Sequence, residues 1–217
     1  MPELGFQVTG IEAGAHGLTP LLHFQLKIAN TPATQTIQNV ILQAQIQLQA
    51  AQRRYSAGEK EKLTELFGPP ERWGDTLRTK LWTIAQTTVR PFTGQTTATL
   101  TVPCTFDLNV LAAKYFYALE GGEIPLLFLF SGTIFYEGED GNLQVQQISW
   151  NKECAYRLPV QVWRELMDHH YPNLAWLTLN REIFERLYAY RRSHGIATWD
   201  QTIEQLLPAM EVAEAVP

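Results

Sequence analysis

The adjacent histidines His169 and His170 are the residues of this chain whose type best suits metal binding. Neighbouring side chains on a helix point about 100° apart, so two adjacent histidines do not converge on one ion. Helices that bind metals offer ligands four residues apart, and Asp168 does not supply that spacing. We therefore interpret the pair as the structural end of a helix and predict no metal site.

Two further residues, Cys104 and Ser131, could act as nucleophiles. Cys104 stands just before a predicted helix, whose backbone donors and dipole could lower the pKa of its thiol. The sequence places no histidine beside it, which favours a small buried thiol. Ser131 lacks the Gly-x-Ser-x-Gly pattern of a nucleophile elbow, so we interpret the following Gly132 as a site of close packing or a bulge. The sequence thus predicts no catalytic residue and no cofactor.

The acidic segment Glu137–Asn142 combines carboxylates with glycines, which could suggest a calcium site. It lacks the regular oxygen spacing and the terminal glutamate of an EF-hand loop. Turn-forming residues between two apolar stretches are typical of a hairpin connection. We therefore predict a hairpin turn at this segment.

Basic and aromatic residues are the remaining candidates for binding. The chain has 17 Lys and Arg against 22 Asp and Glu, a formal net charge of −5, which argues against a nucleic-acid partner. Its six tryptophans fall at loops, strand ends and helix starts. Any tryptophan left exposed would be a good anchor for a partner protein. We predict that a protein partner binds near Arg53, Arg54, Arg72, Trp73 and Trp176.

The composition is typical of a packed globular protein. Of 217 residues, 45% are apolar and 11% are aromatic. Met1–Gly10 has neither the basic start nor the apolar run of a secretory signal, and the apolar stretch Ile124–Phe130 is too short to cross a bilayer. The two cysteines form no Cys-x-x-Cys pair. We expect a cytoplasmic protein without membrane insertion.

The first third of the chain alternates between apolar and polar residues, which is the period of a β-strand. Leu22–Ala29 and Val40–Ala50 show this pattern, and the second carries glutamine on one face. A polar face lies in water, which favours an antiparallel sheet. The connection Asn30–Thr34 has turn-forming residues. We predict that the two strands form a hairpin, preceded by a short strand near Phe6–Ile11.

Further elements are predicted from period, capping and breaker residues. The expected strands are Leu81–Arg90, Thr96–Val102, Ile124–Tyr136 as a central strand, and Leu143–Trp150. Two expected helices precede the central strand, one from a capping box at Ser56 and Glu59 to Gly68, and one over Leu108–Leu119 with Asp107 as its cap. Three follow the strands. They run from Pro159 to Pro172, from an Asn180 cap to Ser193, and from a Thr198 cap to Leu207.

The pattern as a whole predicts an α+β protein. Its core is a twisted antiparallel β-sheet or sandwich, with one helical insertion and with C-terminal helices packed on the sheet. We expect a single domain over residues 1–207 and a flexible tail over residues 208–217.

Five segments occur in an order that resembles one family of proteins. They are Arg54–Ser56, Leu66–Trp73, Pro103–Asp107, Ile124–Gly132 and Tyr156–Val160. The family is an uncharacterised bacterial one, a domain of unknown function that is associated with gene neighbourhoods of nickel–iron hydrogenases. The resemblance covers nearly the whole chain. It implies an accessory role, with a hydrogenase subunit or a maturation factor as partner, and it supplies no catalytic residue.

A second likeness is confined to the C-terminal part. Pro172–Trp176 followed by Asn180 at a helix start is similar to a pattern of the export chaperone SecB. The chain departs from that pattern at Trp176 and Thr178, and its helical insertion after Tyr55 has no counterpart there. The likeness implies distant kinship of fold.

Three functions stay open at this point. The first is a non-catalytic accessory or assembly protein that binds a partner protein, and we prefer it. The second is a SecB-like chaperone that binds unfolded segments. The third is an enzyme whose site is assembled from scattered residues. An open strand edge could also pair with another copy of the chain, which would give a homo-oligomer.

Overall fold

A computed structural model describes residues 1–14, 17–105, 110–138, 140–175 and 177–214, apart from the side chains of residues 110 and 208–214. The chain divides into two compact units, Met1–Leu174 and Ala175–Pro217, which are described separately. The single domain over residues 1–207 and the flexible tail over residues 208–217 stay predictions.

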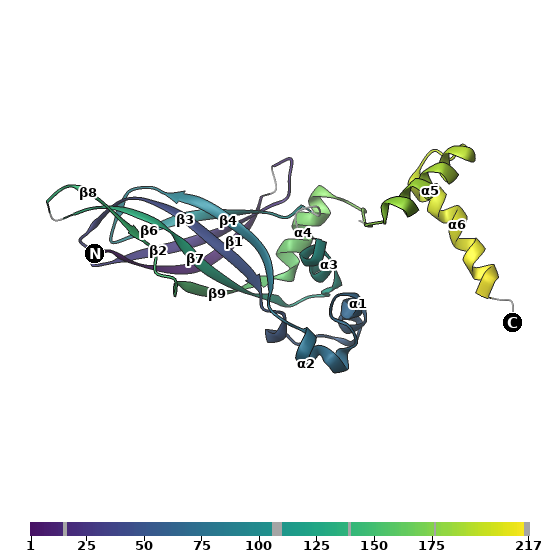
Figure 1. The fold of residues 1–217 in the computed structure, drawn as a ribbon, viewed down its shortest axis with the longest axis horizontal. Helices are drawn as coiled ribbons and strands as arrows, with labels where there is room; N and C mark the ends of the chain where they lie inside the picture. The colour runs from purple at the N-terminus through teal and green to yellow at the C-terminus, as the bar shows by residue number, and fades with distance from the viewer. Residues whose placement is uncertain (15–16, 106–109, 139, 176, 215–217) are drawn as a thin grey trace. The chain divides into compact units, whose positions relative to one another are not determined.

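The first unit contains two antiparallel β-sheets (Figure 1). The three-stranded sheet has the order β1 (Glu3–Gly14), β2 (Leu21–Thr31), β6 (Gln95–Pro103). The six-stranded sheet has the order β4 (Lys80–Val89), β3 (Thr36–Leu48), β7 (Glu123–Glu137), β8 (Leu143–Gln147), while β5 (Phe92–Thr93) pairs with β3 and β9 (Glu153–Pro159) pairs with β7. The predicted α+β class with an antiparallel core is confirmed.

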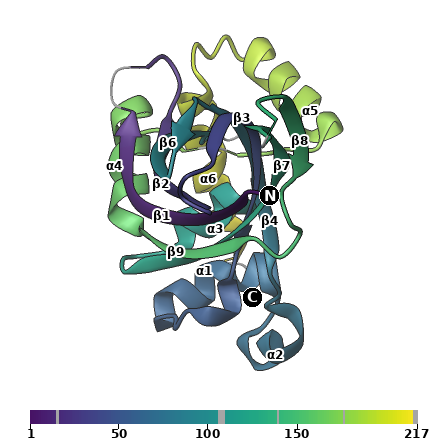
Figure 2. The ribbon, with the colours of Figure 1, turned by 90° about the vertical axis from the view of Figure 1, so that its left-hand side faces the viewer.

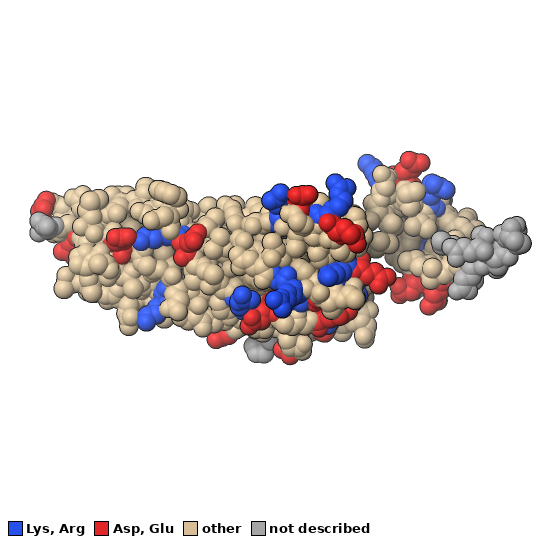
Figure 3. Space-filling view, turned by 90° about the horizontal axis from the view of Figure 1, so that it is seen from below, with Lys and Arg blue, Asp and Glu red and all other residues tan. Residues whose placement is uncertain are grey.

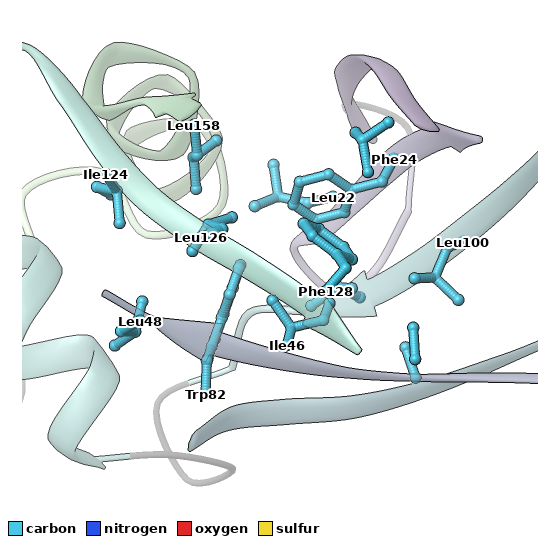
Figure 4. Packing of buried hydrophobic residues seen from close by; sticks show 14 of the residues in the cluster. Leu22, Phe24, Ile46, Leu48, Trp82, Leu100, Ile124, Leu126, Phe128 and Leu158 are labelled. Carbon is cyan, nitrogen blue, oxygen red and sulfur yellow. The ribbon is translucent and has the colours of Figure 1, made fainter. Parts of the chain in front are cut away.

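The two sheets enclose the hydrophobic core between them. The apolar sets predicted from alternation are buried, including Leu22 and Phe24 on β2 and Ile46 on β3. Phe24 packs edge-on against Phe128, with ring centroids 5.1 Å apart, and against Trp82 at 6.3 Å (Figure 4). The sheets also meet at both margins, where β4 lies beside β6 and β1 beside β9 (Figure 2).

The predicted hairpin of the second and third strands is wrong. β2 pairs with β1 and β6, whereas β3 pairs with β4, β5 and β7, so the two strands belong to different sheets. The Asn30 side chain holds the connection by donating hydrogen bonds to the carbonyls of Pro32 and Gln35 at 3.1 and 3.2 Å. Alternation identifies which side chains face the core, but it does not identify the neighbouring strand. Here both apolar faces pack against each other across the core.

The helical insertion after β3 forms as predicted. In α1 (Ala57–Phe67) the Ser56 hydroxyl accepts a hydrogen bond from the Glu59 N–H at 3.1 Å, and the Glu59 carboxylate accepts one from the Ser56 N–H at 2.9 Å. This is a complete capping box. The short helix α2 (Trp73–Thr76) and the 3₁₀ turns η1 (Ala50–Gln52) and η2 (Pro70–Arg72) flank α1.

The second predicted helix is α3 (Val110–Ala118), which packs against α1. Its expected cap, Asp107, lies outside the described residues. The helices α1 to α3 stand at one end of the sheets, and β8 reaches the opposite end (Figure 1).

The strand β7 is central, as expected. It pairs with β3 along its length, and on its other side it pairs first with β9 and then with β8. The change of partner occurs at Gly132, whose φ is +141°. A Cβ at this position would lie 2.0 Å from the carbonyl oxygen of Ile41. The interpretation of Gly132 as a site of close packing is confirmed.

The strand β9 is an element that the sequence analysis missed. We expected helical structure after Trp150, but β8 ends at Gln147 and β9 precedes the helix α4 (Val160–His170). Outward-facing charges such as Glu153 and Arg157 interrupt the apolar run, and the strand is only seven residues long. The predicted start of α4 at Pro159 is confirmed, and its buried face contacts β1 and β9.

The second unit is a pair of helices, α5 (Arg181–Ser193) and α6 (Trp199–Glu214). The predicted caps are confirmed, because Asn180 accepts a hydrogen bond from the Glu182 N–H at 2.9 Å and Thr198 accepts one from the Gln201 N–H at 3.2 Å. The helix α6 continues past Leu207, where we expected it to end. Among the helices described here, none is long and apolar enough to cross a membrane.

Candidate protein-binding surface

Arg53, the first residue of the predicted binding site, is almost entirely buried. Its guanidinium forms an ion pair with Glu59, with Nη2 2.5 Å from Oε1, and the two side chains are only 9% and 5% exposed. It also donates hydrogen bonds to the backbone carbonyls of Gly121 and Glu123 at 2.6 and 2.7 Å. Arg53 therefore ties the chain after β3 to α1 and to the start of β7.

Electrostatics support a structural role for this cluster. Burial alone would raise the pKa of the Glu59 carboxyl, but the N–H groups of Glu120 and Ser56 and the Arg53 guanidinium hold that pKa below its usual range. Burial also raises the pKa of the Tyr55 and Tyr115 hydroxyls, which lie 2.9 Å apart. These tyrosines are neutral at physiological pH and serve packing.

Trp73 belongs to the same packed cluster. Its indole N–H donates a hydrogen bond to the Gly68 carbonyl at 2.8 Å, and its ring lies edge-on to Tyr55 with centroids 5.3 Å apart. By contrast, Arg54 and Arg72 are exposed. Of the predicted binding residues that the structure describes, these two arginines are the ones that a partner protein could reach directly. Trp176 lies outside the described residues.

A small cavity surrounds Cys104 at the helical end of the sheets. Its volume is about 70 Å³, and it is lined by Trp82, Thr83, Pro103, Cys104, Thr105, Ala112, Ala113, Phe116 and Trp163. Such a cavity is much smaller than typical ligand pockets. Burial raises the pKa of the Cys104 thiol to about 12, so the thiolate is not formed at neutral pH. The interpretation of Cys104 as a buried thiol is confirmed.

The rings of His169 and His170 lie edge-on to each other at the end of α4, with centroids 5.1 Å apart. His170 contacts two backbone carbonyls, with Nδ1 3.0 Å from the Leu166 oxygen and Nε2 3.2 Å from the Gly17 oxygen. It thereby links the end of α4 to the segment before β2, which agrees with a structural role. Within the described ranges, no three His, Cys, Asp or Glu side chains are grouped so that they could hold a metal ion.

The outer face of the six-stranded sheet carries few charges. Glutamines alternate with half-exposed apolar residues such as Ile41 and Ile84. Gln86 donates a hydrogen bond to Gln43 across the strands at 2.9 Å. In Figure 3, charged side chains are sparse over the part of the molecule that the strands form. The prediction that the glutamine face lies in water is confirmed.

The strand β8 and the turn after it carry three exposed apolar side chains. Trp150 is 94% exposed, and Leu143 and Val145 are each more than half exposed. Among the described strands, β8 pairs with β7 and with no other. The segment from Leu143 to Asn151 contains no charged residue and no proline. We refer to Leu143, Val145 and Trp150 as the β8 edge surface.

Sequence reasoning did not single out this surface. Trp150 is one of six tryptophans, and the residues of β8 have the pattern of an ordinary strand. A usable signal was present, because Leu143–Asn151 is uncharged and follows an acidic turn at Glu137–Asn142. The hairpin predicted at that turn is confirmed by the pairing of β7 with β8.

Comparisons with known proteins identify a family and no function. A family model described as a family of unknown function (DUF6084) matches residues 1–215. No curated protein matches the chain. The solution structure of a protein described as late embryogenesis abundant (LEA) is 15% identical, with a TM-score of 0.31 over 73% of this chain and 72% of that one.

A crystal structure described as the ApaA protein from Bordetella pertussis is 12% identical, with a TM-score of 0.22 over 73% of this chain and 90% of that one. Structural likenesses this weak carry no argument about function. The predicted resemblance to a family of unknown function over nearly the whole chain is confirmed. None of these matches concerns a hydrogenase or SecB, so the association with hydrogenase genes and the likeness to SecB stay expectations.

Proposed function

The chain belongs to the DUF6084 family of unknown function, and we propose that it is a non-catalytic accessory protein that binds a partner protein at the β8 edge surface. The observation that supports this proposal most directly is the 94% exposure of Trp150 beside an open strand edge. Tryptophan is the residue type most enriched among the side chains that dominate binding energies.

The open edge of β8 suits the addition of a strand from the partner. An edge strand presents unpaired N–H and C=O groups, and proteins usually protect such edges with charges, proline or bulges. Residues Leu143–Gln147 contain neither charge nor proline. Five residues span roughly 17 Å, which is enough for a short extended segment to pair along the edge.

The side chains around the edge define the chemistry of that segment. Val145 lies opposite Phe135 on the outer face, so an added strand would place its own apolar side chains beside them. The acidic turn adjoins Leu143 and contains Glu137 and Asp140. A basic residue at the corresponding end of the bound segment would therefore be favoured.

Hydrogenase subunits and their maturation factors are the first partners to test. This choice is supported only by the resemblance of five sequence segments to a family found near hydrogenase genes. The exposed Arg54 and Arg72, which precede α1 and α2 in the chain, would provide a second contact for an acidic partner. These helices stand at the opposite end of the sheets from β8 (Figure 1).

A co-purification experiment with variants tests the proposal. The immobilised chain is exposed to a lysate of its native host, and the captured proteins are identified by mass spectrometry. We expect at least one protein that binds the wild type and the control Ile84→Ala, whose side chain is 50% exposed on β4, but not Trp150→Ala. Loss of a hot-spot side chain should weaken binding at least about tenfold.

Hydrogen exchange then distinguishes strand addition from other modes of binding. The backbone amides of β8 that face away from β7 should become protected when the captured partner is added. If Trp150→Ala binds every captured protein as well as the wild type does, the β8 edge surface is not the binding site.

Chaperone-like binding of unfolded segments is the second candidate function. The outer face of the six-stranded sheet carries glutamines beside half-exposed apolar side chains, which favours it. A chaperone would delay the aggregation of several unrelated unfolded proteins. A specific accessory protein would delay none of them and would bind one folded partner.

A further inference from the structure

The helices α5 and α6 form a unit without a hydrophobic core of its own, and we propose that they pair with the same helices of a second copy of this chain. The result would be a dimer held by four helices. This inference goes beyond partner binding at the β8 edge surface, and it rests on observations confined to the second unit.

Burial within the unit is minimal. No residue of α5 is buried, and among the side chains described in α6 only Thr202 is buried. Between the two helices, the Trp199 ring lies 5.4 Å from the Phe184 ring and 6.3 Å from the Tyr188 ring, and the Arg191 guanidinium lies 4.4 Å from the Trp199 ring centroid. Even so, Phe184 is 46% and Tyr188 is 47% exposed. One pair of helices therefore leaves several large apolar side chains 41% to 56% exposed.

The apolar side chains of the two helices follow helical spacing. On α5, exposed Ile183 and half-buried Leu187 are four residues apart, and so are exposed Phe184 and Tyr188. On α6, Ile203 and Leu207 show the same spacing, and both are exposed. A stripe of this kind normally faces a packed partner, because exposed apolar stripes lose the free energy of burial. Two helix pairs that cover each other's stripes make a four-helix bundle.

The charges on the two helices favour a second copy as the occupant. The helix α5 has four arginines and two glutamates, whereas Trp199–Leu207 of α6 has Asp200 and Glu204 and no basic residue. In a two-fold bundle, α5 of one copy can lie beside α6 of the other while the two α5 helices lie diagonally. Opposite charges are then neighbours and like charges are separated.

The proposal is tested on the full chain by light scattering after size exclusion and by sedimentation velocity, from low to high micromolar concentration. We expect a dimer of the 24.7 kDa chain. Ile183→Glu places a charge in the stripe at an exposed position and should raise the dimer dissociation constant at least about tenfold. The matched control is Ile84→Glu, which makes the same change at an exposed position of the first unit and should leave the dimer intact.

Further measurements keep the outcome interpretable. Circular dichroism shows whether Ile183→Glu retains its helices, and Leu207→Glu provides a second variant on α6. Trp150→Ala should remain dimeric, so failure of partner binding and failure of self-association are distinguishable. A wild-type chain that is monomeric throughout the concentration range overturns the proposal, as does a dimer that both stripe variants leave unchanged.

Discussion

Replacing Arg53 by methionine should destabilise the first unit more than any other single change of a charged residue near α1. Methionine keeps a similar length but removes the guanidinium. The substitution takes away the hydrogen bonds to Glu59, Gly121 and Glu123. It also leaves the Glu59 carboxylate buried without its counter-ion.

The magnitude follows from that uncompensated charge. Removing one partner of a buried ion pair lowers the free energy of unfolding by about 3–5 kcal/mol. The side chains of Arg53 and Glu59 are only 9% and 5% exposed, so this ion pair is a buried one. For a protein of this size each kcal/mol lowers the melting temperature by roughly 2–4 °C, so we expect a decrease of about 10 °C. The adjacent Arg54 is exposed, and Arg54→Met should change stability by less than about 0.5 kcal/mol.

Urea unfolding monitored by circular dichroism measures both variants. A double variant with Glu59→Gln should be less destabilised than the sum of the single changes, because the remaining partner is then neutral. If Arg53→Met and Arg54→Met unfold at the same urea concentration, the assignment of Arg53 as a structural residue is refuted.

The pH dependence of stability supplies an independent check. The folded-state pKa of Glu59 lies below its unfolded value, so its charged form stabilises the fold above the unfolded pKa. That contribution is lost as pH falls through the folded pKa. Glu59→Gln should therefore flatten the acid side of the stability profile, and an unchanged slope would contradict the ion-pair argument.

Two further predictions concern β7 and the thiols. Gly132→Ala should lower the free energy of unfolding by at least about 2 kcal/mol, because the new Cβ would meet the Ile41 carbonyl and the φ of this residue is positive. A Cβ at Gly10 would meet no atom within 4 Å, so Gly10→Ala should be nearly neutral in the same urea assay. In the native protein a thiol reagent should modify half-buried Cys154 and not Cys104 until the chain unfolds. Equal rates for both cysteines would show that the Cys104 environment is open.

The sequence predicts the faces of the strands better than their neighbours. The alternation of apolar and polar residues correctly placed Leu22 and Val40 in the core, because the two-residue period of a strand puts alternate side chains on the same face. Whether two strands pair or pack face to face depends on the path of the connection, which alternation does not record. For that reason the predicted hairpin of β2 and β3 is wrong. The strand β9 is missed for another reason, because it is short and charged residues interrupt its apolar pattern.

The candidate site shows the same limit at the scale of single residues. Arg53 and Arg54 are indistinguishable in sequence, yet one is buried against Glu59 and the other is exposed. Trp73 and Trp150 likewise share a residue type, but Trp73 fills a cluster with Tyr55 and Trp150 is in water. These differences arise from contacts between segments far apart in the chain.

The pairing of β3 with β7 also bears on how the chain is made. Ile46 lies opposite Phe128, so β3 leaves the ribosome long before its central neighbour is synthesised. Contacts between residues so distant in sequence form slowly. Until its neighbouring strand is present, β3 exposes apolar side chains and unpaired backbone N–H and C=O groups. Completion of the six-stranded sheet must therefore follow the synthesis of β7, and the interval before it is the period in which the nascent chain is most exposed to aggregation.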